Sequence, residues 1–241
     1  MRALYINLDR SPERRQWMEQ QAASLGLALE RIAAVDGAAL DGIPAKLSAG
    51  ALACFHSHRM AWEIVANGDD RYVAIFEDDV HMSPDLPCFL GDPSWIPEDA
   101  DIVHIGRSQE RCIVINDRRK AMDRALYLTV TENSGGDGYI MSRQCARRLR
   151  GEFTDIDQEF DQVLFNQNAF ALRIYKLVPS LCIQDRFLPV PKFGSQIDRK
   201  AKTKSGSRLW REVMRQVRKL RWGTVQALGL AAPIRIDIQF R

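Results

Sequence analysis

Three consecutive carboxylates, Glu77, Asp78 and Asp79, follow directly on the apolar run 73–76. Four apolar residues, two of them β-branched, predict a short buried strand. In open α/β sheets, ligands bind beyond the carboxyl ends of the strands, so these acids stand where a ligand is expected. Crowded acids repel one another unless a cation joins them, and oxygen ligands without sulfur suit Mg²⁺ or Mn²⁺. The motif predicts a metal site, with a capped turn or a helix starting near Pro84 as the alternative.

The elements that must position these acids alternate between strands and helices. Ser11 and Ser48 are expected to cap two helices, which Gly26 and Gly68 end. Strands are expected at 3–8, 29–35, 72–76, 101–105, 127–130, 139–142 and 174–178, and helices at 12–25, 48–65, around 146–149 and at 162–168. This alternation predicts an α/β fold with a mostly parallel sheet that helices cover on both faces.

Length and composition fit one large domain. The 241 residues are 46% apolar and 27% charged, which is ordinary for a globular protein. The five cysteines form no C-x-x-C pair, which argues against a disulfide framework or a zinc site and favours a reducing compartment. Charged residues follow the opening apolar stretch too soon for a signal peptide, so we expect a cytoplasmic protein.

A strongly basic segment stands apart from the rest of the chain. Between residues 199 and 222, ten Lys and Arg oppose one acid, although the whole chain carries a net charge of only +3. Apolar residues recur at helical spacing from Leu209 to Leu220 with arginines on the other side, which is typical of an amphipathic helix on an anionic membrane surface. The alternative is that the apolar face packs on the domain. We expect one globular domain over 1–197 and a basic amphipathic helical tail over 198–241.

Six stretches, taken in order, carry a more specific pattern. They are 6–15 (Ile-Asn-Leu-Asp-Arg-Ser-Pro-Glu-Arg-Arg), 34–37 (Ala-Val-Asp-Gly), 53–58 (Ala-Cys-Phe-His-Ser-His), 76–80 (Phe-Glu-Asp-Asp-Val), 138–143 (Gly-Tyr-Ile-Met-Ser-Arg) and 178–184 (Val-Pro-Ser-Leu-Cys-Ile-Gln). Together they resemble glycosyltransferase family 25, which includes bacterial lipopolysaccharide and lipooligosaccharide galactosyltransferases of the GT-A type. The resemblance spans residues 3 to about 197. Ala53, the pair Phe55-His56 and Asp137 depart from the usual pattern, which bears on donor or acceptor identity.

The resemblance implies a GT-A-like enzyme that moves a hexose from a UDP-sugar, with UDP-galactose expected, to a lipopolysaccharide-type acceptor. It implies Mn²⁺, or Mg²⁺, at Asp79 with Asp78. A divalent cation bridging carboxylates and a diphosphate acts as a Lewis acid while the glycosidic bond breaks. The enzyme would sit on the inner face of the cytoplasmic membrane, beside a lipid-linked acceptor.

Donor-binding residues are expected where the matched stretches meet the ends of strands. A helix N-terminus and guanidinium groups favour anions beside the first strand. The expected donor residues are Asn7, Asp9, Arg10, Arg14, Asp36, Ser57, His58, Glu77 and Asp78. Three alternatives stand beside them: Arg14 and Arg15 on a solvated face with Glu19, Asp36 as a turn former, and His58 as a core residue.

An inverting transferase needs a carboxylate base near the acceptor hydroxyl. Asp161 matches the family's acid best, with Asp157 and Asp137 as substitutes. Asp161 is equally suited to be the N-cap of the helix expected at 162–168.

Two other classes of function compete with transfer. A nucleic-acid-binding or scaffold protein would use the basic tail, but the tail carries no recognition motif and the rest of the chain is mildly acidic, so no nucleic acid is expected. A family member that binds a nucleotide sugar or an anionic polymer without transfer is the other alternative.

Overall fold

A computed structural model describes residues 1–40, 46–130, 135–151, 156, 158–165, 172–193 and 233–241. Three of the expected features lie outside these residues: Asp157, the second half of the helix expected at 162–168, and the amphipathic segment 199–222.

Within the described residues, eight strands form one sheet in the order β2-β1-β3-β10-β5-β11-β9-β8. They are β1 (Arg2–Asn7), β2 (Glu30–Ala33), β3 (Tyr72–Glu77), β5 (Ile102–His104), β8 (Arg119–Ala121), β9 (Arg124–Leu128), β10 (Gly138–Ser142) and β11 (Ile174–Val178). The pairs β1–β2, β1–β3 and β5–β11 are parallel, whereas β10 and β9 run against both of their neighbours. The α/β prediction is confirmed, but the sheet is mixed, because alternation along a sequence predicts elements and not the direction in which each strand enters.

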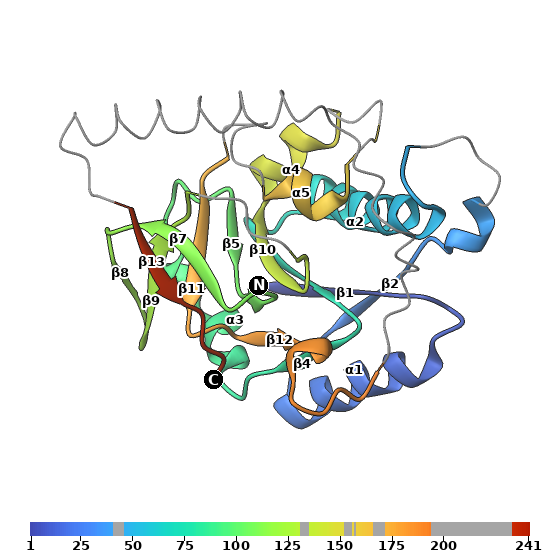
Figure 1. Ribbon diagram of the computed structural model, residues 1–241, viewed down its shortest axis with the longest axis horizontal. Helices are drawn as coiled ribbons and strands as arrows, with labels where there is room; N and C mark the ends of the chain where they lie inside the picture. The colour runs from blue at the N-terminus through green and yellow to red at the C-terminus, as the bar shows by residue number, and fades with distance from the viewer. Residues whose placement is uncertain (41–45, 131–134, 152–155, 157, 166–171, 194–232) are drawn as a thin grey trace.

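Helices cover both faces of this sheet (Figure 1). α2 (Ala49–Asn67), α4 (Arg143–Leu149) and α5 (Phe160–Leu164) lie on one face, and α1 (Pro12–Leu25) and α3 (Leu86–Gly91) lie on the other. Successive strand residues point to opposite faces. Leu4 and Ile75 therefore pack in the core under α2, while Tyr5 and Phe76 pack in the core over α1 and α3.

The expected cap positions flank α1 and α2, but only Ser48 caps its helix through its side chain, because Ser11 makes no side-chain capping hydrogen bond. α1 begins one residue after Ser11, has proline in its first turn and ends at Gly26, whose φ of 65° is left-handed. The Ser48 hydroxyl accepts a hydrogen bond from the Ala51 amide at the start of α2. These caps set the direction in which the chain leaves β1 and returns to β3.

Two smaller sheets complete the described fold. One orders β4 (Val80–Met82), β12 (Cys182–Gln184) and β6 (Gly106–Arg107), and the other pairs β7 (Arg111–Ile115) with β13 (Pro233–Asp237). Short 3₁₀ turns lie at η1 (Gly37–Leu40), η2 (Pro93–Trp95) and η3 (Asp185–Phe187). Because β12 runs antiparallel to β4, Gln184 stands opposite Val80 and so beside the acid motif.

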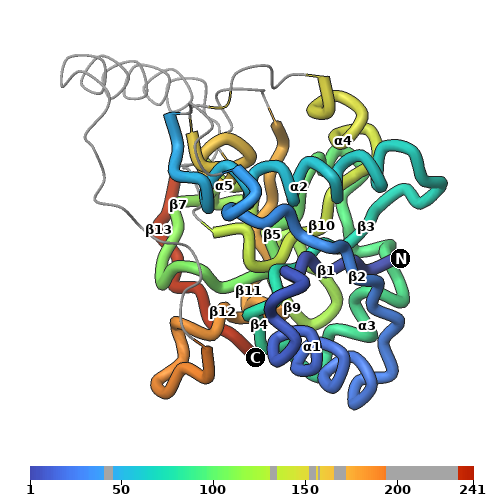
Figure 2. Tube along the Cα trace, turned by 90° about the vertical axis from the view of Figure 1, so that its right-hand side faces the viewer, coloured from blue at the N-terminus to red at the C-terminus, as the bar shows by residue number. Residues whose placement is uncertain are grey.

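The C-terminal strand differs from the helical tail expected over 198–241. Residues 233–237 form β13 along β7, where the red end of the chain lies in Figure 2. Ile238 is buried, and the Arg241 side chain contacts Asp123. The last nine residues thus belong to the folded domain. Among the described helices, none has the length and apolar character needed to cross a membrane.

Candidate active site

The acid motif occupies the connection from β3 to β4. Glu77 is the last residue of β3, and Val80 already begins β4. Asp78 and Asp79 form the turn between these two strands, as the turn alternative holds. A helix does begin near Pro84, at Leu86, but its N-cap is Asp85, so the alternative in which Asp78 or Asp79 caps that helix is wrong. Ile6 of β1 is in register with Glu77, which brings Asn7 and the start of α1 to the same edge of the sheet.

Asp78 has both carboxylate oxygens engaged by protein groups. Arg14 Nη1 donates to Oδ1 at 2.8 Å, and Asn7 Nδ2 donates to Oδ2 at 2.7 Å. Asn7 is held in turn by Arg31, whose Nε donates to the Asn7 side-chain oxygen at 2.9 Å. Arg14, Asn7 and Asp78 are all buried. The protein itself therefore neutralises this acid.

Glu77 and Asp79 share a single amide. Gln184 Nε2 lies 3.1 Å from Glu77 Oε2 and 3.3 Å from both Asp79 oxygens, while Arg14 Nη1 is 3.7 Å from Asp79. Burial, followed by the negative charges of neighbouring acids, raises the pKa of Glu77 to about 8. Burial and the Glu77 charge raise the pKa of Asp79 to about 7. Two acids are thus crowded together with little cationic compensation from the described residues.

Asp137 and Asp161 extend this negative region. After burial, their charges make the largest contributions to the raised pKa of Glu77, with Asp137 ahead of Asp161. Asp161 lies in the first turn of α5 and accepts the Gly135 amide at 2.9 Å, whereas Glu159 is the N-cap. The alternative in which Asp161 is the N-cap is therefore wrong. Gly135 has a φ of 97°, a conformation that suits glycine at this contact.

Asp137 is fully buried and faces the buried imidazole of His104, with the buried ammonium of Lys176 on the far side of that ring. Neither of its carboxylate oxygens accepts a hydrogen bond from the described residues, and His104 Nε2 lies 3.4 Å from Oδ1. Lys176 Nζ contacts His104 Nδ1 at 2.7 Å and donates to the Gly106 carbonyl. Burial lowers the pKa of Lys176 to about 8. A Cβ on Gly106 would collide with the Asp137 carboxylate, so this contact requires glycine.

His58 and Ser57 lie on α2, which packs over this end of the sheet. His58 Nε2 is 3.7 Å from Glu77 Oε1, and Nδ1 is 3.0 Å from the Tyr139 hydroxyl. Burial lowers the pKa of His58 to about 3, so the ring is neutral. The Ser57 hydroxyl accepts the Val35 amide at 2.9 Å and thereby fixes the turn after β2. His58 is thus both buried, as the core alternative holds, and in contact with the acid motif.

The remaining donor candidates form the exposed rim of the site. Arg10 pairs with Asp36 at 2.7 Å, and Asp36 Oδ1 also accepts the Ala38 amide, as a turn-forming residue does. Asp9 pairs with Arg31 at 2.5 Å. Arg15 is exposed and pairs with Glu19, while Arg14 is buried against Asp78. The two neighbouring arginines therefore divide between a solvated face and the site.

Sequence reasoning missed Gln184, Arg31 and the pair His104–Lys176. Gln184 closes the 178–184 stretch of the resemblance, but no motif indicates that its amide reaches two acids 105 and 107 residues away. Arg31 lies opposite Tyr5 in the β1–β2 register, which only strand pairing reveals.

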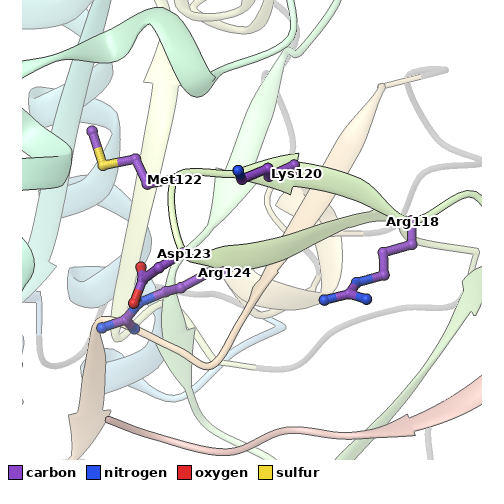
Figure 3. A pocket seen from close by; sticks show the side chains of 5 residues that line it. All are labelled: Arg118, Lys120, Met122, Asp123 and Arg124. Carbon is purple, nitrogen blue, oxygen red and sulfur yellow. The ribbon is translucent and has the colours of Figure 1, made fainter.

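A cavity elsewhere in the fold is lined by Arg118, Lys120, Met122, Asp123 and Arg124 (Figure 3). Arg118 directly precedes β8, the others come from β8, β9 and the turn between them, and none is a predicted site residue. The Arg124 guanidinium is engaged by the Ser180 carbonyl at 2.8 Å and by Asp85 at 2.6 Å. The cavity is therefore no part of the site built around Glu77.

Comparisons with known proteins agree with the motif pattern. Residues 1–164 match the sequence model of Glycosyltransferase family 25 (LPS biosynthesis protein). The lipooligosaccharide biosynthesis protein lic2B of Haemophilus influenzae is 28% identical over 156 residues, which cover 58% of this chain and 56% of that protein. The lacto-N-neotetraose biosynthesis glycosyltransferase LgtE of Neisseria gonorrhoeae is 31% identical over 156 residues, covering 60% of this chain and 55% of that protein.

The chain thus spans about half the length of these relatives. Among solved structures, the galactosyltransferase LgtC, in complex with donor and acceptor sugar analogues, covers 70% of each chain at 10% identity and a TM-score of 0.38, which is too low to support an argument. The family assignment depends on the sequence match, which includes the end of β1, the helix bearing His58, and the acid motif. On that match, the chain belongs to glycosyltransferase family 25.

Proposed function

We propose that this protein transfers a hexose from a UDP-sugar, with UDP-galactose as the first candidate, to a lipooligosaccharide-type glycan. One observation carries the proposal. In a family 25 chain, Glu77 and Asp79 stand at the end of β3 with one amide between them, while the adjacent Asp78 is neutralised by Arg14. Two acids held this way favour a divalent cation, which in turn would bind the diphosphate of a nucleotide sugar.

The donor set suits a hard divalent cation, Mn²⁺ or Mg²⁺. Repulsion between Glu77 and Asp79 is relieved when a cation joins them, and the buried Gln184 Oε1 has no hydrogen-bond partner among the described residues. Asp79 and Glu77 would hold the ion, because both oxygens of Asp78 are already engaged. When bound, such an ion supplies Lewis-acid stabilisation of a diphosphate leaving group.

The nucleotide is proposed to lie along the edge formed by β1, β2 and the start of α1. Arg10 and Asp36 form an exposed ion pair at this edge. The Asp36 carboxylate, which already accepts hydrogen bonds from Arg10 and the Ala38 amide, would also accept one from a ribose or base, and Arg10 offers a guanidinium to phosphate. Asn7, Arg14 and Ser57 are proposed to support the donor site without contacting the donor. Their hydrogen bonds go to protein groups and orient Asp78 and the turn after β2.

Asp161 is the proposed base. It lies in the first turn of α5, near enough to Glu77 to raise its pKa, and among the described residues it accepts a hydrogen bond from the Gly135 amide. In an inverting transfer, the acceptor hydroxyl oxygen would attack the anomeric carbon, the bond to the UDP oxygen would break, and the hydroxyl proton would pass to the Asp161 carboxylate. Asp137 is fully buried behind the site and is better suited to position neighbouring groups than to meet an acceptor.

The acceptor is proposed from the relatives, which are named for lipooligosaccharide and lacto-N-neotetraose biosynthesis. The basic segment 199–222 supports a further part of the proposal, in which the protein binds an anionic membrane that carries a lipid-linked acceptor.

The test is release of free nucleotide from a panel of UDP-, GDP- and CMP-sugars, with Mn²⁺ and with chelator, in the presence of lipid acceptors. We expect UDP release from one donor that stops when metal is removed. Tight binding of a nucleotide sugar with no release from any donor would instead favour the non-catalytic alternative.

A further inference from the structure

Three potential metal ligands of different chemistry converge beside the acid motif. Cys54 and His58 are one helical turn apart on α2, so they lie on the same face of that helix. Glu77 meets them from the end of β3. One ligand atom from each, a sulfur, a ring nitrogen and a carboxylate oxygen, all lie within 4.8 Å of one another.

We propose that Cys54, His58 and Glu77 form a binding site for a soft divalent cation of the Zn²⁺ type. Thiolate and imidazole ligands favour Zn²⁺ over Mg²⁺ or Mn²⁺, which prefer oxygen. Three protein ligands with a fourth position open are the usual number for a zinc site that also takes water or a small ligand. This site differs from the oxygen site at Asp79, with which it shares only Glu77.

The histidine is held in the orientation such a site needs. Its Nδ1 lies 3.0 Å from the Tyr139 hydroxyl, which also accepts the Trp62 indole N–H at 2.8 Å. The Phe160 ring stacks on the imidazole, with centroids 3.6 Å apart. Nε2 is left facing Glu77 at 3.7 Å. A metal-binding histidine commonly uses its second nitrogen in this way to fix the ring.

Cys54 supplies the sulfur ligand of the site, and its side chain is partly exposed. A thiol binds a metal ion as the thiolate, so binding forms a sulfur–metal bond and releases the thiol proton to solvent.

Occupation of this site has a consequence that depends on the proposed function. Glu77 cannot serve both ions fully, so a soft cation at Cys54 and His58 would withdraw Glu77 from the donor site. We therefore expect Zn²⁺ to inhibit Mn²⁺-dependent transfer. The binding claim itself does not require that the protein be a transferase.

The test is titration of the metal-stripped full chain with Co²⁺, a spectroscopic substitute for Zn²⁺. A thiolate bound to Co²⁺ gives a near-ultraviolet charge-transfer band that an all-oxygen site cannot give. We expect this band to saturate at one equivalent, and Zn²⁺ to displace the Co²⁺. Cys54→Ser should abolish the band and weaken Zn²⁺ binding by more than about 100-fold, since losing a group that merely orients a metal ligand costs about 10–100-fold.

Matched controls separate this site from adventitious binding. Cys88→Ser removes an exposed cysteine elsewhere, His56→Asn removes the other histidine of the same motif, and Asp79→Asn removes the oxygen site. All three should keep the band, and His58→Asn should lose it. Circular dichroism and the midpoint of thermal unfolding establish that each variant is folded. A wild-type chain without the band, or a Cys54→Ser chain that binds Zn²⁺ equally well, would overturn the proposal.

The activity measurement distinguishes failure of the two proposals. A thiolate band with no turnover of any donor contradicts the transferase proposal and leaves the soft-cation site standing. Turnover of a donor without the thiolate band contradicts the soft-cation site and leaves the transferase proposal standing. With both present, Cys54→Ser should relieve inhibition by Zn²⁺ while keeping Mn²⁺-dependent transfer.

Discussion

Asp78 and Asp79 are adjacent in sequence, yet their surroundings are opposite. Asp78 is tied to Arg14 and Asn7 at 2.8 and 2.7 Å, whereas Asp79 shares the Gln184 amide with Glu77 and has Arg14 only at 3.7 Å. Both residues lie in the turn between β3 and β4, where their side chains face different neighbours. Asp78 turns toward α1, and Asp79 turns toward β12.

The difference separates an acid neutralised by protein groups from two acids that we propose bind a ligand. Around Asp78, an arginine and an asparagine satisfy the charge internally, which makes this side of the motif a rigid support. Around Glu77 and Asp79, burial and mutual repulsion raise both pKa values. Acids with perturbed pKa values gathered at a strand end are what a functional site is expected to contain.

The most severe way to test this division is to remove the acid assigned to the ligand. Asp79→Asn keeps the shape of the side chain but withdraws a metal ligand, so we expect donor turnover to fall by at least about 10³-fold, roughly 4 kcal/mol in the barrier. The free energy of unfolding without metal should stay the same or rise, because a repelling charge is gone. Rates of UDP release and urea unfolding measure the two effects. A large loss of stability would show that Asp79 is structural after all.

The converse change removes the arginine that neutralises Asp78. Arg14→Ala leaves Asp78 buried and unpaired, and breaking a buried pair in this way costs about 3–5 kcal/mol of unfolding free energy. Urea unfolding gives the value. Asp78→Asn in the same chain should recover part of it. Arg15→Ala, one residue along the same helix, removes only an exposed pair with Glu19 and is expected to leave the unfolding midpoint unchanged. Equal effects of the two alanine substitutions would contradict the division.

Local signals in the sequence predict much of this site. Ser11 and Pro12 indicate the start of α1, and the apolar run 73–76 indicates β3, so short-range patterns alone bring the motif and its support to one sheet edge. Matching residues to a family adds candidate site residues on two of the helices, His58 on α2 and Asp161 on α5.

What the sequence conceals depends on long-range pairing. β4 and β6 have three and two residues, too few to show a period, and β13 pairs with β7 across more than a hundred residues. Gln184 and Arg31 reach the site only through β12 and β2 registers. The antiparallel direction of β10 depends on how the chain connects to it from distant strands, which no local sequence pattern indicates.

Glu77 offers a pH test of the same comparison. Its pKa is raised from the usual 4.5 to about 8 in the fold, so its protonated form contributes stability that is fully present below about pH 4.5 and lost as pH rises through 8. Without metal, we expect the unfolding free energy of the wild type to fall between pH 5.5 and 8.5 by about 2 kcal/mol more than that of Glu77→Gln. One pKa unit corresponds to 1.36 kcal/mol, and ionisation of Asp79 offsets part of the effect of the Glu77 shift.

Urea unfolding of both chains in chelator measures this difference, and other groups titrate in both and cancel. Added Mn²⁺ should restore wild-type stability most at the high end of the range, where both acids are charged. Curves that remain parallel would show that Glu77 ionises freely and that its surroundings are not those of a site awaiting a cation.

The smallest effect concerns the exposed rim, where the comparison predicts function without stability. Arg10 pairs with Asp36 at the surface, so Arg10→Ala should leave the thermal unfolding midpoint unchanged. If the Arg10 guanidinium contacts the donor phosphate, the variant's KM for the donor rises severalfold while kcat is preserved. High salt then reduces the difference in KM between the variant and the wild type, because salt screens the attraction between charges. Arg2→Ala is the matched control, because Arg2 forms a similar exposed pair with Glu30 at the opposite end of β1. A KM that rises equally in both variants would assign the effect to overall charge, whereas a rise in Arg10→Ala alone places the donor beside the acids that the protein leaves uncompensated.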